Sequence, residues 1–266
     1  MNYDAFLQHI CPRLDLNWRK YRRRAARHRL HARMTELRVN SYEQYLAYLA
    51  DNPNEAKELP DRLRITVSRF FREREQWETA GRIILPHLLK SIIPSTNLRI
   101  WSVGCCGGEE PYTIALLWLA CLQTIDPATK IDILATDIDD ASLARAKRAI
   151  YARNTLHEMP AFLFHSYFTA AGNQWLLAEA AKKLVRFKNH NLMKDPAPQN
   201  VDFICCRYYV FTYYTGKRLQ LAMTRLHSAL SKKGVLMIGR RENMGPGNIL
   251  FVPWDQEMCY YRPVTL

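Results

Sequence analysis

Two patterns of apolar and polar residues follow one another along the chain. Up to about residue 65, apolar side chains recur at near-helical spacing, and a second amphipathic segment, SYEQYLAYLA, opens on Ser41 as a candidate helix N-cap. The stripe that we expect to face the core consists of Trp18, Tyr21, Ala25, Leu30, Met34 and Leu37. From residue 66 onward, apolar runs such as LRIWSV, IDILAT, VDFICC and VLMIG alternate with helical segments. This predicts a helical domain over residues 1–65 and a doubly wound α/β domain over residues 66–266.

The alternation of strands and helices lapses between Tyr151 and Asn191. The segment YFTAAGNQWLLAEAAKKLVRFKNHNL fits either a hairpin-like insertion or an excursion that ends in a strand. We therefore expect a small inserted subdomain around residues 152–190.

The composition is that of a folded chain in a reducing compartment. With 266 residues, 48% of them hydrophobic, the chain can bury a substantial core, which excludes disorder as its main state. The longest apolar run, IALLWLACL, is too short to cross a bilayer, and the start of the chain lacks the pattern of a secretory signal. Seven cysteines without a CxxC pair favour reduced thiols. We expect a cytoplasmic protein without membrane insertion.

The charge is strongly basic and unevenly placed. The 38 Lys and Arg residues against 25 Asp and Glu give +13, and residues 18–33, WRKYRRRAARHRLHAR, contain no acid. This block favours an acidic partner, which leaves nucleic acid, anionic lipid and an acidic protein surface open. On a helix whose apolar stripe faces the core, Arg22 and Arg29 lie seven residues apart and Arg23 and Arg27 four apart, so they form basic strips.

A glycine turn follows the first strand of the α/β domain, in LRIWSVGCCGGEEPYTIALLW. Cys106 and Glu109 stand where a dinucleotide site would need further glycines after Gly104, and a phosphate-binding P-loop would need Gly-Lys-Ser/Thr. The next strand, ILATDID, ends at Asp137, whose carboxylate can accept hydrogen bonds from ribose hydroxyls. A glycine turn beside an acid, without a phosphate cradle, suits S-adenosylmethionine.

Two pairs of adjacent cysteines, at residues 105–106 and 205–206, end predicted strands. Adjacent cysteines are poorly placed to supply tetrahedral ligands, and buried cysteine is usually a small apolar filler. The eight histidines show no HExxH spacing. We expect no metal site.

A series of motifs in order carries a resemblance to a known family. The helical segments YRRRAARHRLHARM and SYEQYLAYL are followed by ITVSRFFRE, RIWSVGCCGGEEPYTIAL, ILATDID, NL, CRYYVFTYY and GVLMIGRREN. In this order the sequence resembles the CheR family, the chemotaxis-receptor protein-glutamate O-methyltransferases, over nearly its whole length. The resemblance implies a Rossmann-like S-adenosylmethionine methyltransferase sheet preceded by a small all-α domain, with S-adenosylhomocysteine as product.

The resemblance also implies which residues bind the cofactor. They are Thr66, Ser68, Arg72, Gly104, Glu110, Asp137, Asn191, Leu192, Arg207 and Tyr208. Glu110 would hold the charged amino-acid end of the cofactor, Asp137 the ribose, and the Asn-Leu pair the adenine side. Arg207 and Tyr208 would lie at the pocket floor.

The resemblance further implies that Arg72 and Tyr213 are the candidate catalytic residues, with Tyr213 near the reacting methyl. A glutamate substrate is already an anion at neutral pH, so its methylation needs no general base. It needs in-line placement of the carboxylate oxygen, the methyl carbon and the sulfonium sulfur, and both candidate side chains can orient a carboxylate. The implied partner is an acidic helical region of a receptor protein, bound through Arg22, Arg23, Arg27 and Arg29.

Departures from the family pattern keep other functions open. Tyr208 stands where the family usually has asparagine, and a phenol lacks the paired donor and acceptor of an amide. This favours, as an alternative, a signalling protein that binds the cofactor but has lost turnover. FTAAGNQWLL is short for the loop by which some members grip a receptor's tail peptide, so we do not expect tail-peptide tethering. A methyltransferase of small molecules or of nucleic acid is a further alternative. The N-P-P-Y or D-P-P-Y loop of base methylation is absent, so we do not expect a nucleic-acid partner.

Overall fold

The computed structural model describes residues 1–64, 66–91, 96–245 and 247–264, and the chain divides into two compact units. A helical unit comprises Met1–Ile65 together with Tyr208–Ala222, and an α/β unit comprises Thr66–Arg207 together with Met223–Leu266. The sequence patterns gave no sign that residues 208–222, which lie far along the chain among the strands, belong with the N-terminal helices.

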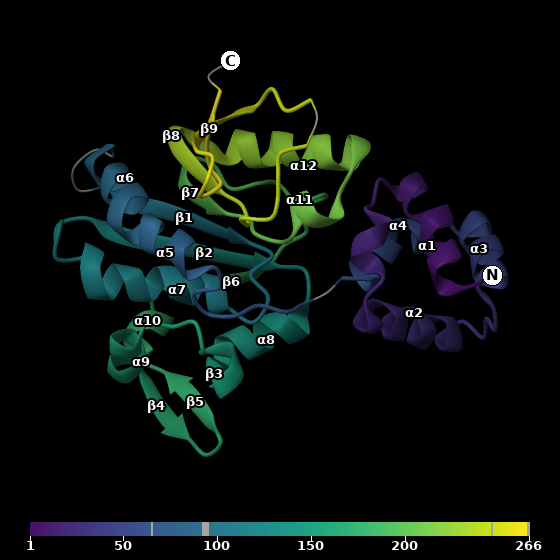
Figure 1. The fold of residues 1–266 in the computed structure, drawn as a ribbon, viewed down its shortest axis with the longest axis horizontal. Coiled ribbons are helices and arrows are strands. Elements are labelled where there is room, and N and C mark those ends of the chain that lie inside the picture. The colour runs from purple at the N-terminus through teal and green to yellow at the C-terminus, as the bar shows by residue number, and fades with distance from the viewer. Residues whose placement is uncertain (65, 92–95, 246, 265–266) are drawn as a thin grey trace. The chain divides into compact units, whose positions relative to one another are not determined.

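Four helices make up most of the helical unit, drawn in purple and dark blue in Figure 1: α1 (Tyr3–Ile10), α2 (Arg24–Glu36), α3 (Tyr42–Asp51) and α4 (Pro53–Arg62). Ser41 caps α3 by accepting a hydrogen bond from the Gln44 amide, which confirms the expected N-cap. Glu55 of α4 is buried and accepts hydrogen bonds from Arg33 of α2 and Tyr45 of α3, so one carboxylate joins three helices.

The basic segment differs from the expected continuous helix. Residues Trp18–Tyr21 form a short 3-10 turn, and α2 begins only at Arg24, because Arg23 has the extended backbone of an N-cap residue. The buried stripe of α2 is Ala26, Leu30 and Met34, whereas Ala25 is exposed. The predicted strips were therefore wrong in register: Arg22 and Arg23 precede the helix that carries Arg27 and Arg29.

Residues 208–222 are tied to the helical unit through the chain between α1 and α2. They include α11 (Val210–Tyr213) and the first half of α12 (Gly216–Ala229). Leu16 and Tyr214 form an antiparallel bridge, and the Asn17 amide donates to the Tyr213 carbonyl at 2.9 Å. Gly216 has φ +49°, and a Cβ there would lie 2.2 Å from Asp15 Oδ1, so this contact requires glycine.

The α/β unit contains a seven-stranded sheet in the order β6-β2-β1-β7-β8-β10-β9. Its strands are β1 (Asn97–Val103), β2 (Lys130–Asp137), β6 (Val185–Asn189), β7 (Val201–Cys205), β8 (Leu230–Met237), β9 (Phe251–Asp255) and β10 (Tyr260–Pro263). Pairing is parallel from β6 to β8, and β10 is antiparallel to both of its neighbours. This confirms the expected α/β sheet.

Helices α5 (Arg74–Thr79), α6 (Leu85–Ser91), α7 (Glu109–Leu117) and α8 (Asp140–Arg148) accompany this sheet (Figure 1). All residues of α7 are buried, which is unusual for a helix that begins with two glutamates. The same core cluster contains Trp77, Phe70 and Phe71 from the segment before and within α5, together with Tyr112 of α7.

A second, smaller sheet interrupts the α/β unit between α8 and β6. It consists of β3 (Ile150–Ala152), β4 (Phe168–Ala171) and β5 (Gln174–Leu177), antiparallel in the order β3-β5-β4, with α9 (Ala161–Tyr167) before β4 and α10 (Glu179–Lys182) after β5. The chain then returns to the main sheet as β6, so this segment contains both a hairpin and a final strand. The helices within the described ranges are all too short or too polar to span a bilayer.

Candidate functional site

The chain leaves β1 at the point where the strand order reverses. β1 pairs with β2 on one side and β7 on the other, and ligands of such sheets bind at the carboxyl ends of the strands beside this reversal. The turn after β1 has three residues with left-handed backbone: Gly104 at φ 70°, Cys106 at φ 49° and Gly108 at φ 89°. A Cβ on Gly108 would lie 3.0 Å from side-chain atoms of Ala146 and Tyr112. The backbone of this turn therefore comes close to α8.

Asp137, the last residue of β2, joins the two turns at this edge. Its Oδ2 accepts a hydrogen bond from the Cys106 amide and its Oδ1 one from the Asp139 amide, each at 2.9 Å. A carboxylate oxygen can accept more than one hydrogen bond, so an acid at this place is chemically suited to bind hydroxyl groups as well. Asp139 is the N-cap of α8, which separates the capping acid from the one at the strand end.

Glu110 lies in the first turn of α7 and is 5% exposed. Its Oε1 accepts a hydrogen bond from Arg207 Nη1 at 2.8 Å, and its Oε2 is 3.5 Å from the Cys205 thiol, a weak donor. One oxygen is thus engaged in a strong ion pair, while the other has only a weak partner among the described residues.

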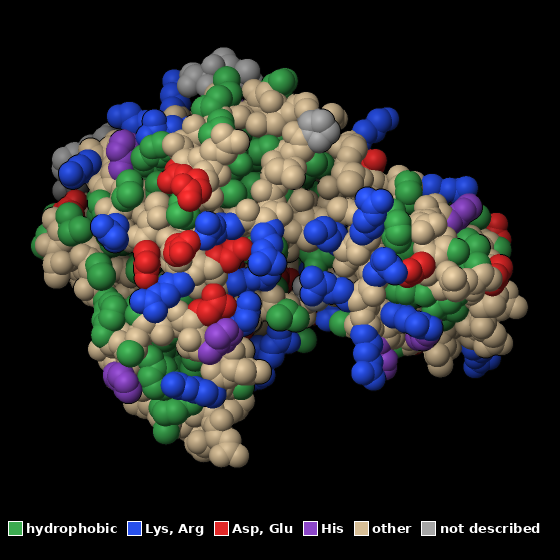
Figure 2. Space-filling model, in the orientation of Figure 1, with side chains coloured by type: hydrophobic (Ala, Val, Ile, Leu, Met, Phe, Trp, Pro, Cys, Tyr) green, Lys and Arg blue, Asp and Glu red, His purple; other side chains and the backbone are tan. Residues whose placement is uncertain are grey.

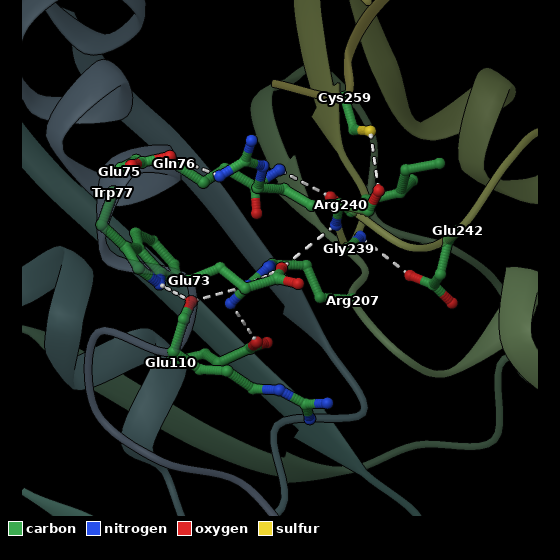
Figure 3. A network of polar contacts seen from close by, with 12 residues as sticks. Glu73, Glu75, Gln76, Trp77, Glu110, Arg207, Gly239, Arg240, Glu242 and Cys259 are labelled. Atoms are coloured by element: carbon green, nitrogen blue, oxygen red, sulfur yellow. Dashed lines mark hydrogen bonds and ion pairs between the residues drawn. The ribbon is translucent and has the colours of Figure 1, made fainter. Parts of the chain in front are cut away.

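Arg207 follows β7, and its side chain is completely buried. In the network of Figure 3, Nη2 donates to Glu73 Oε2 at 2.8 Å and to the Arg72 carbonyl at 2.7 Å, and the guanidinium lies 5.1 Å from the Trp77 ring centre. Burial opposes the charge, but Glu110 and Glu73 outweigh it and hold the pKa of Arg207 above its ordinary value. The guanidinium is thus engaged with protein groups on its two terminal nitrogens, and the expected contact of Arg207 with the cofactor stays a prediction.

In the segment before α5, the backbone amides of two consecutive phenylalanines donate hydrogen bonds to other parts of the α/β unit. The Phe70 amide donates to the Thr155 carbonyl at 2.9 Å, and the Phe71 amide donates to Thr113 Oγ1 of α7 at 3.3 Å. Phe71 and Glu73 have left-handed backbone, at φ 53° and 63°. Between them lies Arg72, which is half-buried and whose carbonyl also accepts from Trp77 Nε1.

Glu109 is a buried carboxyl that the sequence did not single out beyond its place at a helix start. It is 7% exposed, and among the described residues no group donates a hydrogen bond to its Oε2. Burial raises the pKa of Glu109 to about 7, with Arg145 opposing the rise and Glu110 adding to it.

The residues after β6 form a compact turn. The Asn191 side-chain carbonyl accepts from the Met193 amide at 2.9 Å, and the Asn191 amide donates to Asp195. Leu192 is 2% exposed, and the neighbouring His190 amide donates to the Asp137 carbonyl at 3.0 Å. The turn is therefore connected to the end of β2.

The two units divide the expected site residues. The α/β unit holds Thr66, Ser68, Arg72, Gly104, Glu110, Asp137, Asn191, Leu192 and Arg207, and of these the contacts above join Arg72, Glu110 and Arg207 directly. Thr66 and Ser68 are half-buried. Tyr208 and Tyr213 belong to the helical unit, where the Tyr213 ring lies 5.2 Å from that of Tyr21.

Sequence reasoning missed Glu73 and the buried state of Glu109. Glu73 directly follows Arg72 in RFFRE, but an acid beside an arginine is common on helix surfaces and gave no signal of an ion pair with Arg207. Within the described ranges, no group of three or more His, Cys, Asp and Glu side chains is arranged to hold a metal ion.

Two family models match the chain in succession. The CheR methyltransferase all-alpha domain matches residues 1–63, and the CheR methyltransferase SAM binding domain matches residues 66–257. The chain belongs to the CheR methyltransferase family. The cofactor of this CheR domain is S-adenosylmethionine. A carboxylate at the carboxyl end of β2, Asp137, and one at the start of α7, Glu110, are chemically suited to its hydroxyl and ammonium groups.

Relatives of this CheR family member include chemotaxis protein methyltransferases. That of Listeria monocytogenes is 28% identical over 91% of this chain and 90% of its own length. That of Borreliella burgdorferi is 32% identical over 80% of this chain and 77% of its own length. In a 104.1 kDa protein of Rhodobacter capsulatus, 28% identical over 86% of this chain, the match spans only 24% of the relative. A solved S-adenosylmethionine-dependent methyltransferase of Mesorhizobium loti matches 61% of this chain and 54% of its own, with 18% identity and a TM-score of 0.29.

Proposed function

We propose that this protein transfers the methyl group of S-adenosylmethionine to glutamate side chains of a chemoreceptor-type protein. The observation that carries the proposal is that the glycine turn after β1 is bonded to Asp137 and leads into the helix of Glu110, in a chain of the CheR family. Its relatives include chemotaxis protein methyltransferases that match 80–91% of this chain and 77–90% of their own length.

The cofactor supplies an electrophilic methyl group on a sulfonium, and the protein's own residues place it. We assign the ribose hydroxyls to Asp137, the ammonium group to Glu110, and the adenine side to Asn191 and Leu192. Glu110 suits an ammonium because, within the part of the chain that the structure describes, its Oε2 has only a thiol partner, and because a charge-assisted hydrogen bond is strong in such a buried place. Thr66, Ser68 and the Gly104 turn complete the proposed contacts with the cofactor.

No residue needs to remove a proton in this reaction. The attacking glutamate is already ionised at neutral pH, so the protein's task is to align it with the methyl group and to exclude water. We assign Arg72 and Tyr213 to this alignment, since a guanidinium and a phenol can each donate a hydrogen bond to a carboxylate without competing as nucleophiles.

The receptor surface is proposed to meet the basic side chains around the start of α2. Figure 2 shows Lys and Arg side chains spread over the visible face of the helical unit. Arg22 is paired with Asp4 at 2.8 Å and Arg27 lies over the Tyr3 ring, while Arg23 is exposed at the N-cap. An acidic helix would be attracted to this cluster, and salt would weaken the attraction.

Methyl incorporation from labelled cofactor into receptor protein, RNA, DNA and small molecules tests the function. Label in protein that is released by mild base, as a glutamyl methyl ester is, supports the proposal; stable label in nucleic acid contradicts it. Reversing the charges of Arg23 and Arg27 should slow receptor methylation and leave binding of S-adenosylhomocysteine unchanged. The matched control reverses Lys232 and Lys233, exposed residues near the amino end of β8, and should change neither.

A non-catalytic binding protein is the second candidate, and Tyr208 is the residue that favours it. Tyr208 has left-handed backbone at φ 54°, which is rare for a bulky residue, at the position where the family usually has asparagine. Tight binding of S-adenosylhomocysteine without methyl transfer to any receptor preparation would support this candidate over the enzyme.

A further inference from the structure

Glu73 lies at the centre of the contacts drawn in Figure 3. Its Oε2 accepts hydrogen bonds from Arg207 Nη2 at 2.8 Å and from the Arg240 amide at 3.1 Å, and its own amide donates to Glu158 at 2.9 Å. One residue thus connects the end of β7, the chain after β8 and the inserted segment. Its backbone is left-handed, with φ 63° and ψ 60°, a strained conformation for a glutamate that the surrounding contacts hold in place.

Arg207 is shared between two carboxylates. It gives Nη1 to Glu110 Oε1 and Nη2 to Glu73 Oε2, each at 2.8 Å, so its contact with Glu110 uses a single oxygen. An arginine that faces one carboxylate alone tends to bind both oxygens in parallel, in the bidentate arrangement. Nη2 also donates to the Arg72 carbonyl at 2.7 Å, which is an uncharged acceptor. Removing the charge of Glu73 leaves Glu110 as the stronger attraction, so we expect the guanidinium to turn toward both oxygens of Glu110.

The second oxygen of Glu110 is the one that matters for the cofactor. Glu110 Oε2 has only the Cys205 thiol as a weak partner among the described residues, and a bidentate Arg207 would occupy it with a strong one. Glu73, Glu110 and Arg207 together carry a net negative charge, because two carboxylates share one guanidinium. Glu73 therefore keeps Arg207 away from Glu110 Oε2, and its negative charge makes the cluster attractive to a cation.

We propose that Glu73 is a positioning residue, which holds Arg207 so that Glu110 keeps one oxygen for the ammonium group of the cofactor. This inference rests on the proposed function, because it takes Glu110 as the residue that binds the ammonium. Glu73 acts through Arg207 and Glu110 and does not itself touch the cofactor.

The test compares two ligands that differ at the amino-acid end. S-adenosylhomocysteine carries the ammonium group, whereas 5′-methylthioadenosine keeps the adenosine and the sulfur but lacks it. In calorimetric titrations, Glu73→Gln should weaken S-adenosylhomocysteine about tenfold, which is ~1.4 kcal/mol at 25 °C, and should change 5′-methylthioadenosine less than about twofold. The matched control is Glu75→Gln, an exposed glutamate two residues away that pairs with Arg240, and it should change neither ligand.

A double-mutant cycle separates positioning from an independent contribution. Glu110→Gln alone should weaken S-adenosylhomocysteine, and adding Glu73→Gln should then have little further effect, because both changes remove the same interaction. Additive losses would show that Glu73 acts without Glu110 and would overturn the proposal.

The remaining outcomes are distinguishable. Equal loss of both ligands would make Glu73 a support of the fold alone, and no loss of either would remove it from the site; both overturn the inference but leave the proposed function standing. If the natural protein binds neither ligand, the proposed function fails and this inference with it. If Glu73→Gln does not fold, Glu73→Asp takes its place, because the shorter side chain cannot reach Arg207 in the same way. Its binding of the same two ligands is measured and judged by the same results.

Discussion

Glu109 should make the folded protein less stable above neutral pH, and Glu109→Gln should remove that loss. The carboxyl is 7% exposed at the start of a buried helix, and within the described residues its Oε2 receives no hydrogen bond. Burial raises the pKa of Glu109 to about 7 from its ordinary value of 4.5, because a carboxylate loses its hydration there. The neutral amide of glutamine resembles the protonated acid in shape and charge.

The sign and size follow from linkage between protonation and folding. The folded state holds the proton up to about pH 7, whereas the unfolded chain releases it near pH 4.5. Stability from this group is therefore fully present below pH 4.5 and is lost as the pH rises through 7. The whole difference corresponds to ~3 kcal/mol, of which about 2.5 kcal/mol falls between pH 5 and pH 8.

Urea denaturation at pH 5 and pH 8 measures this effect as a free energy of unfolding. We expect Glu109→Gln to gain about 2.5 kcal/mol relative to the natural protein between the two pH values. Glu78→Gln, which changes an exposed carboxylate of α5, is the control and should shift stability by less than ~0.5 kcal/mol at either pH. An equal difference between Glu109→Gln and the natural protein at both pH values would refute the reasoning, since it would mean that the carboxyl ionises with the same pKa in both states.

Three further predictions concern the site. Arg207→Met should lower the free energy of unfolding by ~3–5 kcal/mol, because it leaves Glu110 and Glu73 without their shared cation. The control, Arg186→Met, breaks an exposed ion pair and should change the free energy of unfolding by less than ~1 kcal/mol. Asp137→Ala should weaken S-adenosylhomocysteine by about 1.5–3 kcal/mol in calorimetry, and unchanged affinity would remove Asp137 from the site. Tyr208→Asn should preserve stability, since asparagine tolerates the left-handed backbone, and should strengthen binding of S-adenosylhomocysteine; weaker binding would make Tyr208 an adapted contact.

The sheet could be predicted because its signals are local. Apolar runs bounded by glycine and aspartate mark the ends of β1 and β2, and Asp139 follows its strand at the spacing of a helix cap. The glycine turn was recognisable for the same reason: left-handed backbone at Gly104 and Gly108 is what glycine provides most readily.

The polar network could not be predicted because it depends on residues far apart in the sequence. Glu73 and Arg207 are separated by 134 positions, and nothing in RFFRE distinguishes an acid that is paired with a distant arginine from one in water. The register of α2 failed for a different reason. The basic block has helical spacing throughout, but the 3-10 turn at Trp18–Tyr21 and the extended Arg23 shift the helix start, so Ala26 replaces Ala25 in the core.

The hydrogen bonds of Asp137 have a consequence for how a ligand would be received. Its carboxylate restrains the Cys106 and Asp139 amides, and the preceding Thr136 carbonyl accepts from the Gly104 and Cys105 amides. Both turns are therefore ordered by the protein itself, and these amides should exchange slowly with solvent deuterium before any ligand arrives. We therefore expect association to carry little conformational-entropy penalty at this edge, so that binding of the cofactor should not require these two turns to fold first.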